Sequence, residues 1–251
     1  MGILEGRVAI VTGASSGVGR GCARRFAEEG AAVVACARRL ENLQTLVQEV
    51  EAKGGKALAV TCDVAEEADI TRVVDAAIER FGRIDILANI AQGGMEDHVG
   101  LLKTTPEGLL DAYVTGPLQS LLFMQKCFPH MRRQRYGRII NTSSLIALDG
   151  SPGFAPYAMA KGAIMALTRN ASQEWAQFGI TTNTFLPIVS TERSIERNAG
   201  KEDPVTARIP GRRLGTAYDD CSPVLAFLAS EAAGYVNGQA IGIDGGLRLI
   251  A

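Results

Sequence analysis

The stretch Thr12-Gly13-Ala14-Ser15-Ser16-Gly17-Val18-Gly19 carries the information that decides the fold of this 251-residue chain. It follows an apolar, β-branched run over residues 7–12, which predicts a buried strand, and it leads into a helical pattern over residues 17–29. Glycines allow a sharp turn and the close approach of a ligand, while a helix N-terminus offers unpaired N–H groups and the positive end of the helix dipole. We interpret the stretch as a phosphate-binding turn, with a plain tight strand-to-helix turn as the alternative.

Strand and helix patterns alternate along the rest of the chain. Strand-like runs are expected at residues 32–36, 57–61, 84–89, 138–141, 180–185 and 240–243. Helical patterns fall over residues 40–53, 66–81, 106–135, 155–178 and 217–230. This alternation predicts right-handed βαβ units, and therefore an α/β fold with a parallel sheet that helices cover on both faces. We expect one domain over residues 1–251, with the irregular stretch 191–214 as a substrate lid.

Composition excludes several classes of protein. The chain is 47% hydrophobic and 21% charged, which is typical of a globular protein with a large core. A net charge of −1 creates no field for nucleic acid or acidic lipid, and no apolar run is long enough to span a bilayer. Five cysteines without a Cys-x-x-Cys pair, and only two histidines, predict buried reduced thiols and no metal site. The start of the chain has no signal-peptide pattern, so we expect a cytoplasmic protein without nucleic-acid or membrane partners.

A second motif points to catalysis. Tyr157 and Lys161 are four residues apart within a helical pattern, which places both on one helix face, and Ser144 lies thirteen residues before Tyr157, just after an expected strand. Together with the Gly-x-x-x-Gly-x-Gly turn, this Ser…Tyr-x-x-x-Lys arrangement resembles the classical short-chain dehydrogenase/reductase family, and the resemblance covers essentially the whole chain. It implies a Rossmann-type, doubly wound parallel sheet of about seven strands, with Ser144, Tyr157 and Lys161 as catalytic residues. A surface helical pair beside an unrelated serine is the alternative.

The chemistry of alcohol oxidation and ketone reduction suits these residue types. An ordinary tyrosine has a pKa of about 10 and is a poor base at neutral pH. The cation of Lys161 and an oxidised nicotinamide would both favour the Tyr157 phenolate. In the reducing direction Tyr157 would donate its proton to the carbonyl oxygen, while Ser144 holds that oxygen in place. The cofactor carries the hydride, and the protein supplies placement and field.

The end of the second strand bears on the choice of cofactor. An NAD site usually has a carboxylate there, whereas this sequence reads Cys36-Ala37-Arg38-Arg39. A guanidinium fork matches a 2′-phosphate, and two cations near a helix start are best explained by a neighbouring anion. We therefore expect NADP(H) to be preferred, with NAD(H) possible. A solvated arginine pair is the alternative, and the glycine turn lacks the basic residue that many NADP-dependent relatives have.

The resemblance also assigns a set of cofactor contacts. Its members are Gly13, Ser15, Ser16, Gly17, Val18, Gly19, Arg38, Arg39, Asp63, Val64, Asn89, Ala91, Tyr157, Lys161, Pro187, Val189 and Thr191. Lys161 would hold the nicotinamide ribose, and Asp63 would contact the adenine. The alternative for Asp63 is an N-cap of the next helix.

Three segments depart from the family pattern. Relatives carry Asn-Asn-Ala-Gly after the fourth strand, but here the sequence is Asn89-Ile90-Ala91-Gln92. Gly116 stands where the family's fourth catalytic residue, an Asn, is expected, and Pro117 follows it. We hypothesise that this Gly-Pro kink frees the carbonyl of Tyr113 to hold a catalytic water, although the kink could merely shape packing. Ile188 replaces a glycine beside the expected nicotinamide site.

The expected substrate wall is mostly apolar. It comprises Gly93, Gly94, Met95, Leu145, Ile146, Ala147, Pro152, Phe154 and the lid. We therefore expect a ketoreductase or alcohol dehydrogenase that acts on a hydrophobic secondary alcohol or ketone. A non-redox enzyme on the same fold, or a nucleotide-binding module with little turnover, remains the alternative. The resemblance implies a homodimer or homotetramer.

Overall fold

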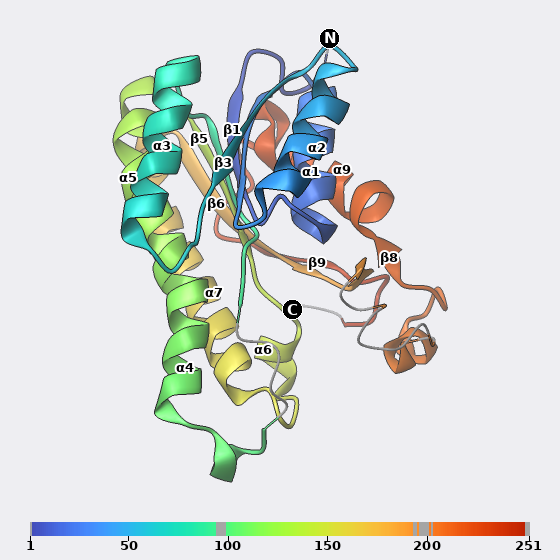
Figure 1. Ribbon diagram of the computed structural model, residues 1–251. Helices are drawn as coiled ribbons and strands as arrows, with labels where there is room; N and C mark the ends of the chain where they lie inside the picture. The colour runs from blue at the N-terminus through green and yellow to red at the C-terminus, as the bar shows by residue number, and fades with distance from the viewer. Residues whose placement is uncertain (1, 94–98, 193–194, 196–200, 202, 249–251) are drawn as a thin grey trace.

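Seven parallel strands form the central sheet of the computed structural model, which describes residues 2–93, 99–192, 195, 201 and 203–248 (Figure 1). The strand order is β3-β2-β1-β4-β5-β6-β9. The strands are β1 (Val8–Thr12), β2 (Ala32–Ala37), β3 (Lys56–Thr61), β4 (Ile86–Asn89), β5 (Gly137–Thr142), β6 (Ile180–Pro187) and β9 (Ala240–Ile243). Their bounds lie within two residues of the predicted ones.

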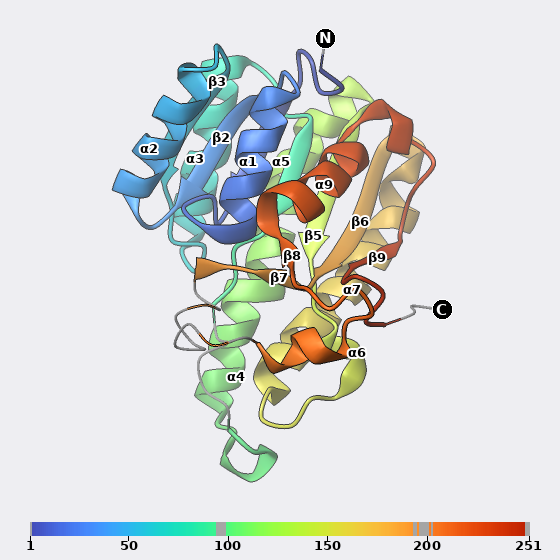
Figure 2. The same cartoon turned by 90° about the vertical axis from the view of Figure 1, so that its right-hand side faces the viewer.

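Helices cover both faces of the sheet, as predicted from the alternating patterns. One face carries α1 (Gly17–Glu28), α2 (Leu40–Glu51) and α9 (Ser222–Ala229) (Figure 2). The other carries α3 (Glu67–Phe81), α5 (Gln119–Gln134) and α7 (Ala155–Trp175), while α4 (Pro106–Tyr113) extends beyond the ends of the strands (Figure 1). Because both faces are buried, β1 and β2 read as nearly continuous apolar runs, and every residue of β1 is buried. Two apolar cores result, one on each side of the sheet.

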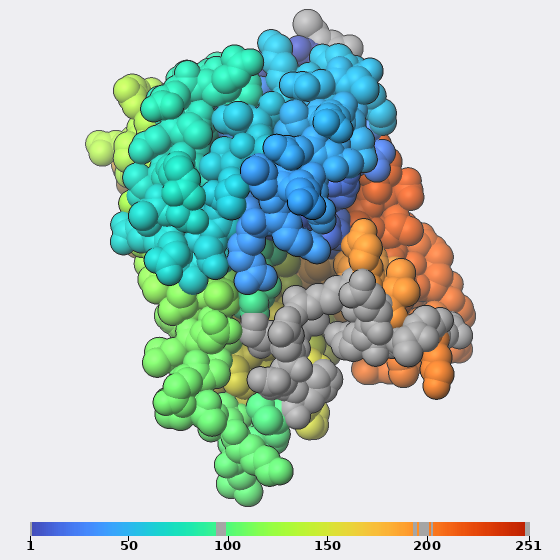
Figure 3. Space-filling model, in the orientation of Figure 1, coloured from blue at the N-terminus to red at the C-terminus, as the bar shows by residue number. Residues whose placement is uncertain are grey.

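The predicted long helix over residues 106–135 is broken. A π-helical turn, η2 (Val114–Leu118), separates α4 from α5, and Pro117 lies inside it. Proline has no N–H to donate to the preceding turn, so the backbone hydrogen bonding widens there. Gly116 and Pro117 thus lie in a π-helical turn between two α-helical segments, and the role of the Tyr113 carbonyl stays a prediction. We call α4, η2 and α5 together the α4–α5 rod. Its α4 end, with the short helix η1 (Leu101–Lys103) ahead of it, projects from the body of the molecule (Figure 3).

Shorter elements lie at the ends of the strands and helices. They are α6 (Ile146–Asp149), η3 (Ala176–Phe178), β7 (Val189–Ser190), η4 (Pro204–Arg208), β8 (Gly215–Thr216), η5 (Ala217–Cys221) and η6 (Glu231–Ala233). The predicted helix over 217–230 thus begins as a separate π-helical turn, η5, before α9. All five cysteines are buried free thiols. Among the described residues, no helix is both long and apolar enough to cross a membrane.

Candidate active site

The glycine turn connects the end of β1 to the start of α1. Gly17 has φ +52°, a left-handed conformation that favours glycine. A Cβ on Gly19 would lie 2.2 Å from the carbonyl oxygen of Gly13, so only glycine fits where the helix passes over the turn. Thr12 Oγ1 accepts hydrogen bonds of 2.9 Å from the N–H groups of both Ile90 and Ala91. The ends of β1 and β4 are therefore fastened together beside the turn.

A cavity of about 910 Å³ opens at this edge of the sheet. It brings together eight of the predicted cofactor residues: Gly13, Ser15, Ser16, Arg38, Arg39, Asp63, Val64 and Ala91. Nine residues that the cofactor prediction did not include complete the lining: Arg20, Ala37, Asn42, Thr45, Cys62, Gln92, Gly93, Thr115 and Glu192. Most of these lie one helical turn or one loop residue away from a predicted contact. Motif matching alone does not show which way such neighbours face.

Basic side chains lie over the glycine turn. Arg39 is the N-cap residue of α2, and its Nη2 donates to Ser15 Oγ (3.3 Å) and Ser16 Oγ (3.1 Å). Arg38 beside it is exposed, and β2 ends at Ala37 rather than at a carboxylate. An anion in the turn would meet a guanidinium whose present partners are two neutral hydroxyls. This geometry suits a phosphate group better than a ribose diol.

The start of α1 already holds a carboxylate. Glu192 Oε2 accepts a hydrogen bond of 3.1 Å from the N–H of Gly17, the first residue of the helix. Free N–H groups and the positive dipole end attract negative charge to such a position. Glu192 lies within the predicted lid but was not predicted as a cofactor contact, and it is 175 residues further along the chain than Gly17. Its carboxylate marks where a ligand diphosphate would compete.

Asp63 lies at the cavity but does not cap the next helix. Glu66 is the N-cap residue of α3, and the Asp63 carboxylate instead accepts from the N–H of Ala65 at 3.0 Å. The backbone N–H of Asp63 donates to Asp69 Oδ2 at 2.9 Å. The helix-cap alternative for Asp63 is therefore wrong, while its adenine contact stays a prediction.

Lys161 is held rigidly beside Tyr157. Its Nζ donates to the carbonyl oxygen of Thr142 at 2.8 Å and lies 5.5 Å from the centroid of the Tyr157 ring. Ser143 Oγ donates to the Lys161 carbonyl at 2.9 Å, which ties α7 to the end of β5. Burial lowers the pKa of Lys161 from 10.5 to about 7. A buried amine next to a phenol is an arrangement that can tune and pass a proton near neutral pH.

Ser144 is the second residue after β5 and is buried. Its Oγ accepts a hydrogen bond of 3.3 Å from the N–H of Ile146. The short helix α6 that begins there packs against α7, so the segment with Ser144 and the helix with Tyr157 lie together at the carboxyl ends of the strands (Figure 2). The three predicted catalytic residues, Ser144, Tyr157 and Lys161, thus lie at the edge of the sheet that also holds the glycine turn. None of these three residues lines the 910 Å³ cavity itself.

The side chain of Asn89 points into the interior, and its predicted cofactor contact stays a prediction. Its side chain is buried, and Nδ2 donates to Asn141 Oδ1 at 2.9 Å. Asn141 Nδ2 in turn donates to Thr168 Oγ1 on α7 at 2.9 Å. Asn89 therefore joins β4 to β5 and α7 beneath the site, and its side chain does not line the cavity.

The segment after β6 lies across the mouth of the turn. Pro187 ends β6, and Val189 pairs with Gly215 in the small β7–β8 sheet. Thr191 Cγ2 would be 3.3 Å from a Cβ on Gly17, so this residue lies over the start of α1. Ile188 has no positive φ and donates its N–H to the Ile243 carbonyl at 2.9 Å. Gly94, Met95 and most of the predicted lid up to residue 202 lie outside the described residues.

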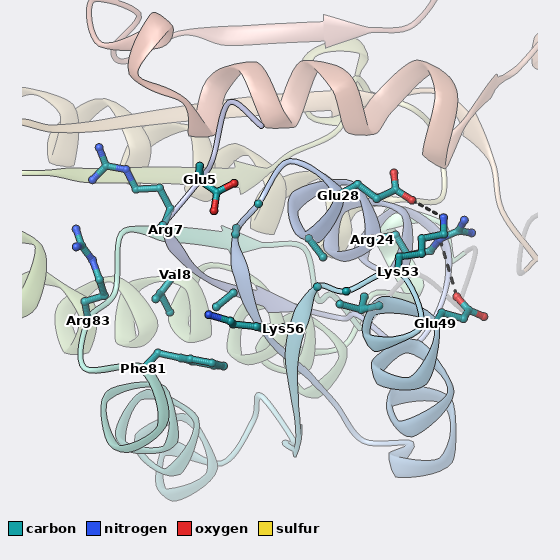
Figure 4. Close-up of a pocket in the computed structure, with 18 residues that line it drawn as sticks. Glu5, Arg7, Val8, Arg24, Glu28, Glu49, Lys53, Lys56, Phe81 and Arg83 are labelled. Atoms are coloured by element: carbon teal, nitrogen blue, oxygen red, sulfur yellow. Dashed lines mark hydrogen bonds and ion pairs between the residues drawn. The ribbon is translucent and has the colours of Figure 1, made fainter. Parts of the chain in front are cut away.

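A second cavity, of about 540 Å³, lies at the opposite edge of the sheet (Figure 4). It is lined where β1, β2 and β3 begin, and two ion pairs lie within its lining. Lys53 Nζ lies 2.7 Å from Glu28 Oε1, and Arg24 Nε lies 3.9 Å from Glu49 Oε2. This cavity contains none of the predicted site residues.

Comparisons with known proteins identify the family of this chain. A profile of the family described as Enoyl-(Acyl carrier protein) reductase matches residues 13–248. The chain is 36% identical over 246 residues to 3-oxoacyl-[acyl-carrier-protein] reductase FabG of Thermotoga maritima, covering 97% of this chain and 98% of that protein. It is 38% identical over 249 residues to 2-(R)-hydroxypropyl-CoM dehydrogenase of Xanthobacter autotrophicus, covering 97% and 99%. The solved structure of the reductase YwfH shares the fold, with a TM-score of 0.91, 24% identity and coverage of 98% and 99%. The chain therefore belongs to the short-chain dehydrogenase/reductase family, whose members are nicotinamide-dependent oxidoreductases.

Proposed function

We propose that this protein is an NADP(H)-preferring oxidoreductase that interconverts a hydrophobic secondary alcohol and its ketone. The observation that carries the proposal is the buried Lys161 ammonium, 5.5 Å from the Tyr157 ring, on the same sheet edge as an anion-binding glycine turn. The names of two relatives fit this reaction, since one is a 3-oxoacyl reductase and the other a 2-hydroxypropyl dehydrogenase.

The residues of this chain divide the chemistry between them. A bound nicotinamide would supply or accept the hydride. In the reducing direction Ser144 hydrogen-bonds the substrate carbonyl oxygen, and Tyr157 donates its O–H proton to that oxygen as the C–H bond forms. Lys161 holds positive charge beside the phenol and so stabilises the phenolate that remains. In the oxidising direction the same phenolate takes the proton from the alcohol.

The preference for NADP(H) rests on the end of β2. Arg39 reaches over the glycine turn, and Arg38 stands beside it with no carboxylate at Ala37 to repel a 2′-phosphate. The N–H groups of the glycine turn and of the first residues of α1 would hold the diphosphate, in the place that Glu192 now occupies. Substrate choice follows from the apolar residues after β5, namely Leu145, Ile146 and Ala147.

We also propose that the protein works as a homodimer or homotetramer. Several large apolar side chains are exposed on the α4–α5 rod and on α7: Leu110, Tyr113, Leu118 and Met159. Light scattering after size-exclusion chromatography measures the state directly. A monomer at micromolar concentration would contradict this part of the proposal.

The test is a panel of aliphatic and aromatic ketones and β-ketoesters, each supplied with NADPH or with NADH. Turnover is followed by the loss of reduced-cofactor absorbance, and product by chromatography. We expect reduction of at least one hydrophobic ketone, with a higher kcat/KM for NADPH. Tight cofactor binding without any turnover would indicate a binding module, and product formation without cofactor oxidation would indicate a non-redox enzyme. Either result would overturn the proposal.

A further inference from the structure

The space beside Gly116 is filled by a side chain from another segment. A Cβ built on Gly116 would lie 2.8 Å from Gln92 Oε1, 3.0 Å from Gln92 Nε2 and 3.3 Å from its Cδ. The carboxamide of Gln92 thus packs against the bare backbone of the π-helical turn η2, where any side chain at position 116 would have to begin. The Gln92 carboxamide can lie there because residue 116 has no side chain. We therefore treat Gln92 and Gly116 as a matched pair.

The Gln92 carboxamide is anchored on one side and open on the other. Its Nε2 donates to the carbonyl of Gly93 at 3.0 Å and to the carbonyl of Ala112 at 3.3 Å, near the end of α4. Its Oε1 is buried and has no hydrogen-bond partner among the described residues. A buried carbonyl oxygen without a donor is unfavourable, so a water molecule at this position would be stabilising.

The unpaired acceptor Gln92 Oε1 lies in the same part of the molecule as α7. The turn η2 packs against α7, which carries Tyr157 and Lys161. Lys161 has three N–H donors, and within the described part of the chain Thr142 supplies the one acceptor seen for them. Gln92 itself lines the cavity that holds the glycine turn. A water held by Oε1 would therefore lie between the cofactor cavity and the helix of the buried amine.

We infer that Gln92 is a positioning residue, whose carboxamide occupies the side-chain space of Gly116, fastens the 91–93 loop to α4, and keeps Oε1 as an acceptor for a catalytic-site water. The catalytic part of this inference rests on the proposed function. The packing part does not, because it depends only on the pairing of residues 92 and 116.

A stability cycle tests the packing part without any substrate. It compares the parent with Gln92→Ala, Gly116→Ala and the double variant by denaturant unfolding. We expect Gly116→Ala to lower the unfolding midpoint in the parent, because the new methyl displaces the carboxamide. In the Gln92→Ala background the same change should be neutral or stabilising, because alanine favours a helix more than glycine does. An equal effect in both backgrounds would overturn the pairing.

Kinetics tests the catalytic part. Gln92→Met keeps the volume of the side chain but removes its amide, and we expect about a tenfold fall in kcat with KM and NADPH affinity little changed. The double variant Gln92→Gly with Gly116→Asn places an amide in the same space, but attached to residue 116 instead of residue 92. It should recover most of the lost kcat. Gln134→Met is the matched control, since the Gln134 amide bridges the backbone of Ile84 at the far edge of the sheet. It should lower stability and leave kcat unchanged.

The outcomes separate the two proposals. If the parent reduces ketones and Gln92→Met keeps full kcat, the inference about Gln92 is wrong and the proposed function stands. A low kcat that the exchanged amide fails to restore would also contradict it. If the parent reduces no ketone at all, the proposed function and the catalytic part fail together. The stability cycle still decides the pairing in that case.

Discussion

The two edges of the central sheet handle charge in opposite ways. At the edge where the strands begin, a buried carboxylate neutralises two arginines: Asp85 is fully buried and accepts from Arg83 at 2.8 and 2.7 Å, from Arg7 and from the N–H of Val8. At the edge where the strands end, Lys161 is buried with a single carbonyl acceptor within the described chain, and Arg39 rests on neutral hydroxyls. The first edge is built for stability, and the second leaves polar groups available for a ligand.

This contrast explains why a cavity alone does not identify the site. Both edges hold cavities of several hundred Å³. Within the part of the chain that the structure describes, only the carboxyl edge combines an anion-binding helix start, exposed guanidinium groups and a buried amine whose pKa is lowered by burial. Substitutions at the two edges should therefore separate stability from function.

The largest expected effect on stability comes from Lys161 and depends on pH. Below about pH 7 both the folded and the unfolded chain hold the Lys161 proton, so the folded state bears the full penalty of a buried cation. Between about pH 7 and 10.5 the unfolded chain binds more protons, so stability rises with pH. We expect Lys161→Met to be more stable than the parent at low pH, by a margin that shrinks by about 3–5 kcal/mol towards pH 10.5. Denaturant unfolding across this range measures the margin, and a constant difference would contradict the account.

Asp85→Asn should damage the amino edge alone. Removing the charge leaves Arg7 and Arg83 without a buried partner, and we expect a loss of about 3–5 kcal/mol in unfolding free energy. The Kd for NADPH, measured by fluorescence well below the unfolding temperature, should stay within about twofold of the parent. A selective loss of cofactor affinity in the folded variant would break the division between the two edges.

Arg39→Ala should weaken binding at the carboxyl edge. Charge-assisted hydrogen bonds to a phosphate contribute about 1.5–3 kcal/mol, so the Kd for NADPH should rise by about 10-fold to 100-fold. The Kd for NADH should barely change. The matched control is Arg72→Ala, whose exposed guanidinium pairs with Asp69 at 2.8 Å and does not line the cavity. Equal losses for both cofactors would mean that Arg39 does not read the 2′-phosphate.

Glu192→Gln should have the smallest effect and the opposite sign. The carboxylate on the Gly17 N–H must leave before a diphosphate can bind there, and a charge at a helix start contributes about 0.3–1 kcal/mol. Neutralising it should tighten NADPH binding by about two- to fivefold. Glu67→Gln serves as control, since Glu67 lies in the first turn of α3 and pairs with Lys126. Weaker binding in Glu192→Gln would show that the carboxylate does not compete with the cofactor.

The sequence allowed the sheet, the helices and the glycine turn to be predicted because local patterns determine them. Alternating runs mark the strands, and Pro117 marks the break between α4 and α5. Contacts between distant segments could not be predicted in this way. The inward orientation of the Asn89 side chain depends on its hydrogen bond to Asn141, which is held by Thr168. The contact of Glu192 with α1 depends on the path of the chain after β6.

The departures from the family pattern were visible in the sequence, but their relation to each other was not. Gln92 and Gly116 are 24 positions apart, and each taken alone reads as the loss of an expected residue. The structure brings the amide of one into the space left by the other. A signal that could have found this is the complementary size of the two residues, a large amide where glycine is expected and glycine where an amide is expected.

The central claim is that the Tyr157 hydroxyl transfers the proton while the carboxyl edge holds the cofactor. The most direct measurement compares Tyr157→Phe with the parent for both NADPH affinity and kcat on the best ketone of the panel. We expect kcat to fall by about 10²–10⁴-fold, the usual contribution of a general acid, with the Kd for NADPH changed by no more than about twofold. A Tyr157→Phe protein that still turns over at the parent rate would contradict the account.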